Sequence, residues 1–148
     1  MKDNYIKNCY KKILAADSVY DIAIKSPTQF APKLSSKLKN NIFIKREDLQ
    51  PVFSFKLRGA YNKISKLKKP GHIIAASAGN HAQGVAMTCK KLKLSSSIVM
   101  PSTTPSIKVN AVKKLGSKVI LAGDTYDEAF DFAIKHAKKN KYEFIHPY

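Results

Sequence analysis

The chain has 148 residues, 44% of them hydrophobic and 25% charged, which is ordinary for a soluble globular domain with a buried core. Its sequence has no apolar run near the roughly 18 residues that a membrane helix needs, and no signal peptide is expected at its N-terminus. The net charge is +17, but 25 of the 27 basic residues are lysines spread over every segment, so we do not expect dedicated nucleic-acid binding.

The first part of the chain predicts a helix followed by an arm. Apolar residues at helical spacing predict an amphipathic helix over residues 5–16. Two dipeptides, Ser26-Pro27 and Ala31-Pro32, then mark turns and extended segments, and a short helical stretch follows near 34–38. We therefore assign residues 1–41 to an N-terminal helix and arm.

The remainder, residues 42–148, predicts an α/β fold in which strands and helices alternate. Short β-rich runs indicate strands at 42–44, 72–76, 97–100, 118–122 and 142–145. Helical spacing of apolar residues indicates helices at 54–67, 82–92, 107–115 and 126–137. Gly116 suits the position that follows the third of these helices. From residue 72 onward the alternation is regular and typical of βαβ units with flanking helices, so we expect a parallel sheet there.

Residues 54–59, Ser-Phe-Lys-Leu-Arg-Gly, single out Lys56 among the lysines. This lysine stands between an apolar approach, formed by Val52, Phe53 and Phe55, and an amphipathic helical pattern. Aromatic neighbours can remove water from an amine and so favour its neutral form, which attacks carbonyl groups. We interpret Lys56 as a candidate attachment point for an aldehyde cofactor. The alternative is an amphipathic helix start that carries an ordinary lysine.

A second informative stretch, Ser77-Ala78-Gly79-Asn80-His81, follows a predicted strand and opens a helix. Backbone N–H groups at a helix start lie in a positive dipole field, so they predict a site for a carboxylate or a phosphate. Gly79 allows a ligand close to the backbone, and Gly84 lets a neighbouring element or a ligand pack against the helix. Asn80 suits a helix cap or a donor to a ligand. His81 is either part of a ligand loop or an early-helix polar residue, and the whole stretch is alternatively a plain turn.

Together the two stretches resemble the pyridoxal-phosphate enzymes of the second fold type, and most closely the biosynthetic threonine dehydratases. The matching runs are residues 45–61 and 77–86, with shorter ones at 99–101 and 107–109, and the resemblance covers nearly all of the chain. Serine racemases and catabolic threonine dehydratases usually have Thr-Gly-Ser-Phe-Lys at the lysine. Here the corresponding run is Val52-Phe53-Ser54-Phe55-Lys56, which favours the biosynthetic group.

The resemblance implies a role for each matching residue. It implies that pyridoxal 5'-phosphate is bound covalently by Lys56, which also acts as the general base, and that the ring of Phe55 packs against the cofactor. It further implies that Asn80 bonds the cofactor 3′-oxygen and that Ser77 to His81, including Ala78 and Gly79, hold the substrate carboxylate. The implied reaction is β-elimination from L-threonine to 2-oxobutanoate and ammonia, the first step towards isoleucine. We interpret Arg46 and Arg58 as structural partners of nearby acids.

The family holds the cofactor phosphate with four consecutive glycines, whereas no two of the six glycines here are adjacent. We therefore expect the arm and small α/β subdomain of a catalytic domain whose rest is absent, with activity belonging to the complete enzyme, a homo-oligomer acting on a small amino acid. Two alternatives stay open: an inactive remnant, and a lysine-rich polyanion-binding module. Cys9 and Cys89 form neither a disulfide framework nor a metal pattern, so we expect a reduced, cytoplasmic protein.

Overall fold

The computed structural model describes residues 2–147, so Met1 and Tyr148, the outermost residues of the two predicted parts, lie outside the described residues. The helices are α1 (Lys2–Leu14), α2 (Pro32–Leu38), α3 (Lys56–Ile64), α4 (Asn80–Leu92), α5 (Ser106–Lys114) and α6 (Tyr126–Asn140), with a 3-10 turn η1 (Glu47–Leu49). The strands are β1 (Thr28–Phe30), β2 (Phe43–Lys45), β3 (His72–Ala76), β4 (Ser95–Met100), β5 (Lys118–Leu121) and β6 (Glu143–Phe144).

Four of these strands form a parallel sheet in the order β5-β4-β3-β6. Its central pair aligns His72 with Ser95 and Ala76 with Val99, and β6 joins the free side of β3 with Ile74 opposite Phe144. The predicted parallel α/β sheet is confirmed. Gly116 has a φ of 94° directly after the C-cap of α5, as its predicted position requires.

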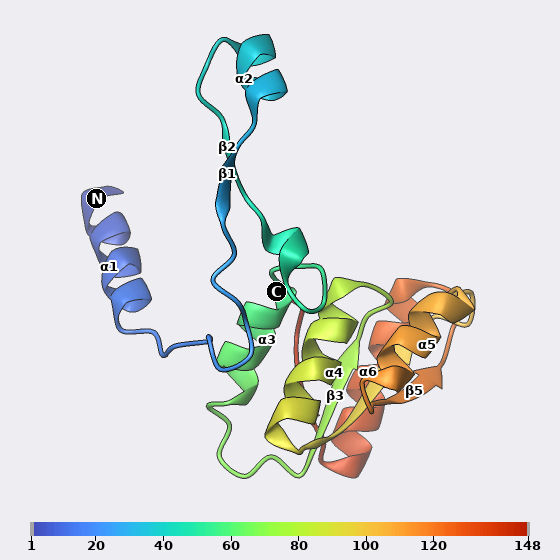
Figure 1. The fold of residues 1–148 in the computed structure, drawn as a ribbon. Coiled ribbons are helices and arrows are strands. Elements are labelled where there is room, and N and C mark those ends of the chain that lie inside the picture. The colour runs from blue at the N-terminus through green and yellow to red at the C-terminus, as the bar shows by residue number, and fades with distance from the viewer. Residues whose placement is uncertain (1, 148) are drawn as a thin grey trace.

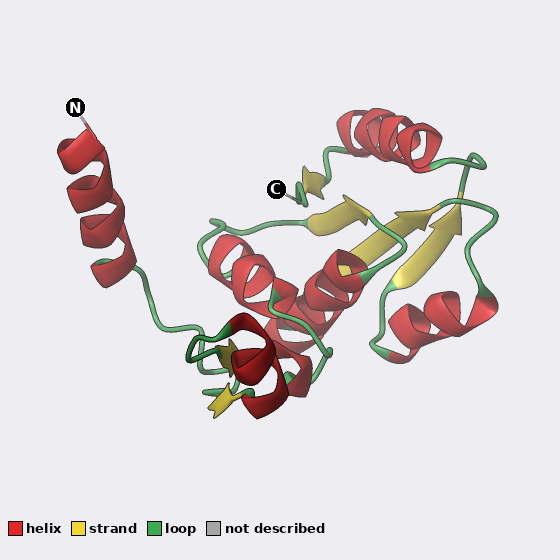
Figure 2. Cartoon of the chain, turned by 90° about the horizontal axis from the view of Figure 1, so that it is seen from above, coloured by secondary structure: helices red, strands yellow, loops and turns green. Residues whose placement is uncertain are grey.

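Helices cover both faces of the sheet, as Figure 2 shows from above. Successive strand residues point to opposite faces. Ile73 and Ala75 of β3 therefore pack in a cluster with α3, α4 and α5, whereas Ile74 and Ala76 pack against α6. The alternation of β3 places α3 and α4 together on one face, and these two helices pack against each other.

The N-terminal part projects from this sheet (Figure 1). α1 stands off to one side with its apolar residues in solvent, and a hairpin of β1 and β2 carries α2 at its tip. The strands of the hairpin are antiparallel, with Thr28 opposite Lys45 and Phe30 opposite Phe43. The sequence indicated only an extended segment for β1, because a three-residue strand gives no clear periodic signal. The predicted division at residue 41 falls inside this hairpin and stays a prediction.

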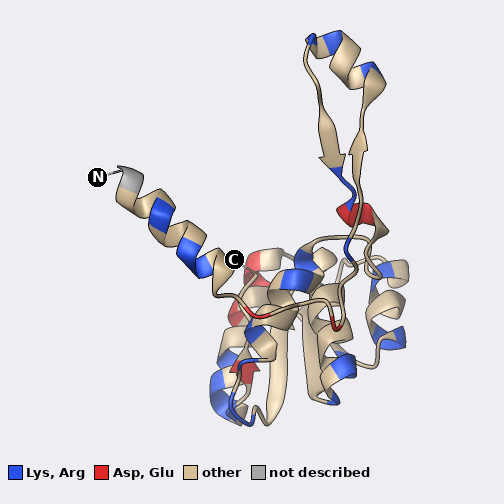
Figure 3. Cartoon of the chain, turned by 60° about the vertical axis from the view of Figure 1, so that its left-hand side comes forward, with Lys and Arg blue, Asp and Glu red and all other residues tan. Residues whose placement is uncertain are grey.

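Lysine and arginine residues occur in the helices and in the arm and do not follow one another in a single stripe along the ribbon of Figure 3. Within residues 2–147, no helix combines the length and the apolar character needed to cross a membrane. No three of the described His, Cys, Asp and Glu residues are grouped so that they could hold a metal ion.

Candidate active site

The carboxyl ends of β3 and β6 lie side by side at one edge of the parallel sheet. From β3 the chain passes through α4 to β4 on one side, whereas β6 pairs with β3 on the other. Such a reversal of strand order leaves a crevice outside the carboxyl ends, where open α/β sheets bind their ligands. The loop 77–79 follows β3 and the segment 145–147 follows β6. We therefore place the candidate active site here.

Lys56, the first residue of α3, lines a cavity of about 480 Å³ at this edge. Its Nζ donates a hydrogen bond of 2.9 Å to the carbonyl oxygen of Pro147 and lies 5.8 Å from the centre of the Phe55 ring. His81 and residues 145–147 line the same cavity. The volume is in the range of small-molecule sites, so the amine faces a space that a cofactor or an amino acid can enter.

The aromatic residues beside Lys56 do not shield it from water as the sequence indicated. Phe53 and Phe55 are 75% and 60% exposed, and only Val52 of the apolar approach is buried. Shielding requires that the rings pack onto Lys56 against other elements, but neither ring joins a hydrophobic cluster of the described residues. Phe53 instead stands in a turn with a φ of 56°. The apolar neighbours in sequence are therefore not apolar surroundings in space.

His81 is buried, with 7% of its surface exposed, and faces the same cavity as Lys56. Its Nε2 lies 3.1 Å from the carbonyl oxygen of Ile145, and since a carbonyl only accepts, Nε2 carries the proton. Burial lowers the pKa of His81 most, the hydrogen bond to Ile145 partly opposes this, and the charges of Lys56 and His146 lower the pKa further. The ring is therefore neutral near neutral pH, with Nδ1 as an acceptor. His81 is a buried cavity residue and not merely a polar residue at a helix start.

The loop between β3 and α4 has a different cap from the one predicted. Gly79 occupies the cap position of α4 and Asn80 is its first helical residue, so the cap role predicted for Asn80 is wrong. The reason is local: the Oγ of Ser77 accepts the N–H of Gly79 at 3.1 Å and closes the loop before Asn80. First-turn N–H groups have no partner within their own helix and lie at its positive end. The anion-binding role of Ser77 to His81 stays a prediction.

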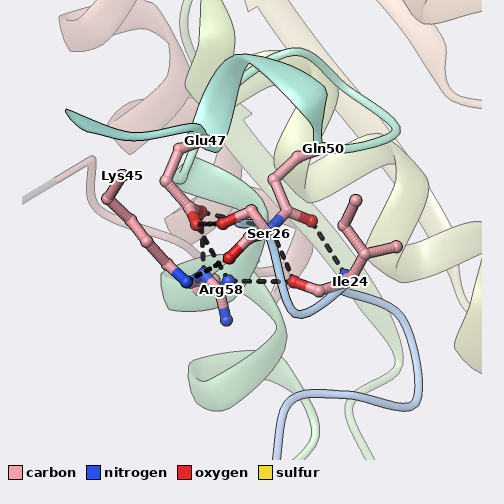
Figure 4. A network of polar contacts seen from close by, with 6 residues as sticks. All are labelled: Ile24, Ser26, Lys45, Glu47, Gln50 and Arg58. Carbon is pink, nitrogen blue, oxygen red and sulfur yellow. Dashed lines mark hydrogen bonds and ion pairs between the residues drawn. The ribbon is translucent and has the colours of Figure 1, made fainter. Parts of the chain in front are cut away.

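A polar network ties the start of α3 to the preceding segments (Figure 4). Arg58 donates to both carboxylate oxygens of Glu47 at 2.8 and 2.9 Å, and to the carbonyl of Ile24 at 3.0 Å. Gln50 donates to the same carbonyl at 2.9 Å and accepts the N–H of Ile24 at 3.0 Å. Ser26 completes the network by donating to Glu47. Arg58 lies two residues after Lys56, so this network anchors the turn that carries the amine.

Both arginines pair with nearby acids, which confirms the prediction made for them. The pair of Arg58 and Glu47 is largely buried, with side chains 24% and 18% exposed, whereas the 2.7 Å pair of Arg46 and Asp48 is more open. The bidentate guanidinium of Arg58 lowers the pKa of Glu47 to about 2. The sequence did not single out Gln50, because one polar residue in an irregular segment has no periodic or motif signal.

The chain matches one protein family and a group of curated relatives. A family model described as pyridoxal-phosphate dependent enzyme matches residues 19–148. The chain is 56% identical over 138 residues to a threonine dehydratase of Nicotiana attenuata, which covers 91% of this chain and 23% of that protein. It is 52% identical over 142 residues to a biosynthetic L-threonine dehydratase of Pasteurella multocida, covering 94% and 28%. The chain thus spans about a quarter of the length of these relatives.

A solved structure is similar over nearly the same part of the chain. The processed form of threonine deaminase isoform 2 from Solanum lycopersicum aligns with a TM-score of 0.87 at 52% sequence identity. The alignment covers 92% of this chain and 38% of that one. The arrangement of arm, sheet and flanking helices therefore occurs as part of a larger solved protein.

Proposed function

Because the chain belongs to the pyridoxal-phosphate dependent enzyme family, as its sequence motifs indicated, we propose that the complete protein deaminates L-threonine by β-elimination. The products are 2-oxobutanoate and ammonia, and in biosynthesis this reaction is the first step towards isoleucine. The observation that carries the proposal is the amine of Lys56 at the wall of a cavity at the carboxyl ends of β3 and β6.

The described residues fit the aldehyde end of pyridoxal 5'-phosphate. Covalent attachment of an aldehyde requires an amine that the aldehyde can reach, and Lys56 supplies this amine at the wall of a cavity of about 480 Å³. Phe55 beside it and Asn80 at the start of α4 would hold the ring and its 3′-oxygen. The bound cofactor supplies an electron sink that makes the α-proton of an amino acid acidic.

Different residues of this chain bind the substrate, accept its proton and position the wall of the cavity. The N–H groups at the start of α4, within residues 77–81, bind the substrate carboxylate and orient the amino acid. The Nζ of Lys56, once neutral, accepts the α-proton. The neutral ring of His81 adds no competing positive charge, and through Ile145 it holds the end of β6 against the cavity. Loss of the β-hydroxyl follows proton removal.

Trapping the lysine adduct tests the proposal. The chain is incubated with pyridoxal 5'-phosphate, reduced with borohydride and mapped by peptide mass spectrometry. We expect preferential modification of Lys56, lost in Lys56→Arg and kept in Lys90→Arg, a matched change in the last turn of α4. No preference for Lys56 would contradict cofactor binding by this chain and favour the inactive remnant. Tight, salt-dependent DNA binding would instead favour the polyanion-binding alternative.

Three properties of the complete protein remain predictions. We propose that the complete protein is a homo-oligomer. We also propose that its substrate is a small amino acid, because the deamination reaction acts on an amino acid. We also propose a cytoplasmic location. The relatives include a protein of the bacterium Pasteurella multocida and proteins named chloroplastic from Solanum lycopersicum, so the compartment is tested by imaging the tagged complete protein.

A further inference from the structure

α4 crosses the first turn of α3 at Gly84, where the two backbones approach closely. A Cβ added at Gly84 would lie 3.1 Å from both the carbonyl carbon and the carbonyl oxygen of Lys56, and 3.2 Å from the nitrogen of Leu57. These three atoms are the peptide bond that follows Lys56. The sequence-based expectation that a neighbouring element packs on Gly84 is confirmed, and the element is the turn that carries the candidate amine.

The same side of α4 carries the start of the helix. Residues three and four apart share one face of a helix, so His81 and Asn80 lie on the face of Gly84. His81 lines the cavity of Lys56, in agreement with this placement. The separation of the two backbones at Gly84 therefore also sets how far the amine lies from the first turn of α4.

Helix formation alone does not explain a glycine at this position. Glycine is among the poorest residues for a helix interior, yet Gly84 lies in the second turn of α4. Its φ is not in the left-handed region, unlike those of Gly116 and Gly123. Around Gly59, inside α3, an added Cβ would meet no atom within 4 Å. The close approach to the peptide bond after Lys56 is what disfavours a side chain at Gly84.

We propose that Gly84 is a positioning residue for Lys56. By lacking a side chain, it lets α4 rest directly on the peptide bond after Lys56, and this contact fixes the amine relative to the anion-binding start of α4. A methyl group at Gly84 displaces the first turn of α3 by a few tenths of an ångström. We expect such a displacement to weaken the hydrogen bond of 2.9 Å from Lys56 to the carbonyl of Pro147. The positioning role of Gly84 rests on the proposed function only in that the proposed function identifies the ligand that reacts with Lys56.

Competitive acetylation of the lysines tests the position of the amine without any cofactor. Small amounts of acetic anhydride are applied to the native chain, and the labelling of each lysine is compared with that in denaturant. In Gly84→Ala we expect labelling of Lys56 to rise about twofold, because a weakened hydrogen bond loses only part of the roughly fivefold protection that a whole one provides. Labelling of the lysines outside α3 is expected to stay the same.

Two variants control for general effects. Gly71→Ala makes the same chemical change in a loop where an added Cβ meets no atom within 4 Å, and we expect unchanged labelling. Val112→Ala removes buried volume from α5, none of whose residues lines the cavity, and lowers stability. If Val112→Ala raised labelling of Lys56 as much as Gly84→Ala, Gly84 would have a structural role only. Unchanged labelling in a folded Gly84→Ala variant would overturn the proposal.

Trapping with pyridoxal 5'-phosphate in the same variants separates the two proposals. Preferential trapping at Lys56 in the wild-type chain, lost in Gly84→Ala, supports both. If the wild-type chain shows no preference for Lys56 but acetylation rises in Gly84→Ala, the proposed function fails and the positioning role is supported.

A measurement on the wild-type chain covers the case in which Gly84→Ala does not fold. Leu57 and Ile107 are each the second residue of a helix, where N–H groups have no partner within the helix. Leu57 is fully buried and its backbone nitrogen lies 3.2 Å from the position of a Cβ at Gly84, whereas Ile107 is 76% exposed. We expect slower amide hydrogen exchange at Leu57 than at Ile107. Equally fast exchange at Leu57 would contradict the contact on which the proposal depends.

Discussion

Removing the charge of Glu47 while keeping its shape should destabilise the chain in a pH-dependent way. Glu47 accepts two hydrogen bonds from Arg58 and one from Ser26, so Glu47→Gln leaves a largely buried guanidinium without its charged partner. Breaking one side of such a pair costs more than the pair contributes, because the remaining charge has lost both solvent and partner.

The depressed pKa of Glu47 sets the magnitude. The pKa falls from 4.5 to about 2 on folding, and each unit corresponds to about 1.4 kcal/mol. The full shift would be worth roughly 3 kcal/mol, which we reduce to about 2 kcal/mol because the side chain is 18% exposed and partly screened. A folded-state pKa below the unfolded one adds stability above the unfolded pKa. This contribution is lost as the pH falls from 4.5 towards 2.

Urea unfolding followed by circular dichroism measures the effect. With a slope of about 2 kcal/mol per molar urea, Glu47→Gln should lower the midpoint at neutral pH by about 1 M. The difference from the wild-type chain should shrink to less than half by about pH 3, because the wild-type carboxylate is losing its advantage. Asp48→Asn breaks the exposed pair with Arg46 and is the matched control, for which we expect a much smaller change.

A difference between the wild-type chain and Glu47→Gln that stays constant from neutral pH to about pH 3 would refute this reasoning. It would mean that the substitution removes packing or hydrogen bonds but that no charge contribution was present. An equal loss in Asp48→Asn would likewise show that burial does not distinguish the two ion pairs.

Burial raises the pKa of the Cys89 thiol to about 11, so a thiol reagent at about pH 8 should modify half-exposed Cys9 in the native chain and Cys89 only after unfolding. Thr125→Ala removes the hydroxyl of a capping box with Glu128 at the start of α6 and should lower the free energy of unfolding by about 1 kcal/mol in urea. Phe53→Gly should raise the free energy of unfolding by about 0.5 kcal/mol. Glycine adopts the left-handed φ of 56° without strain, and this gain exceeds the cost of the larger entropy of the unfolded chain. The exposed ring of Phe53 contributes little packing that would be lost.

The sequence was sufficient for elements whose signal is local. β3 is a continuous apolar run that is buried on both faces, and its flanking helices each carry apolar residues along one face. The chain passes between them by short loops, so this alternation predicts a parallel sheet. β1 has no local periodic signal of this kind, because it is stabilised by pairing with β2, and α2 lies between the two strands in the sequence. Its strand character depends on a partner that periodicity does not identify.

In the candidate site, too, some residues could be predicted from the sequence and others could not. Lys56 and His81 lie in motifs, and the structure brings them to one cavity. The wall formed by residues 145–147 could not be predicted, because it contacts Lys56 and His81 through backbone carbonyls, which every residue possesses. The prediction that apolar residues shield Lys56 from water was wrong. It rested on residues next to Lys56 in the sequence, whereas the exposure of Phe55 depends on which elements pack against its ring in space.

The motif around Lys56 therefore does not place its amine by itself. Arg58 fixes the turn to Glu47, Gly84 brings α4 onto its backbone, and the segment after β6 receives the hydrogen bond of the amine at Pro147. Pro147 lies 91 residues from Lys56 in the sequence, and it reaches the amine only when β6 has paired with β3. A peptide of residues 54–59 should consequently show no preference among aldehydes or anions. Selective chemistry at Lys56 requires the folded chain, since these three contacts join segments that lie apart in the sequence.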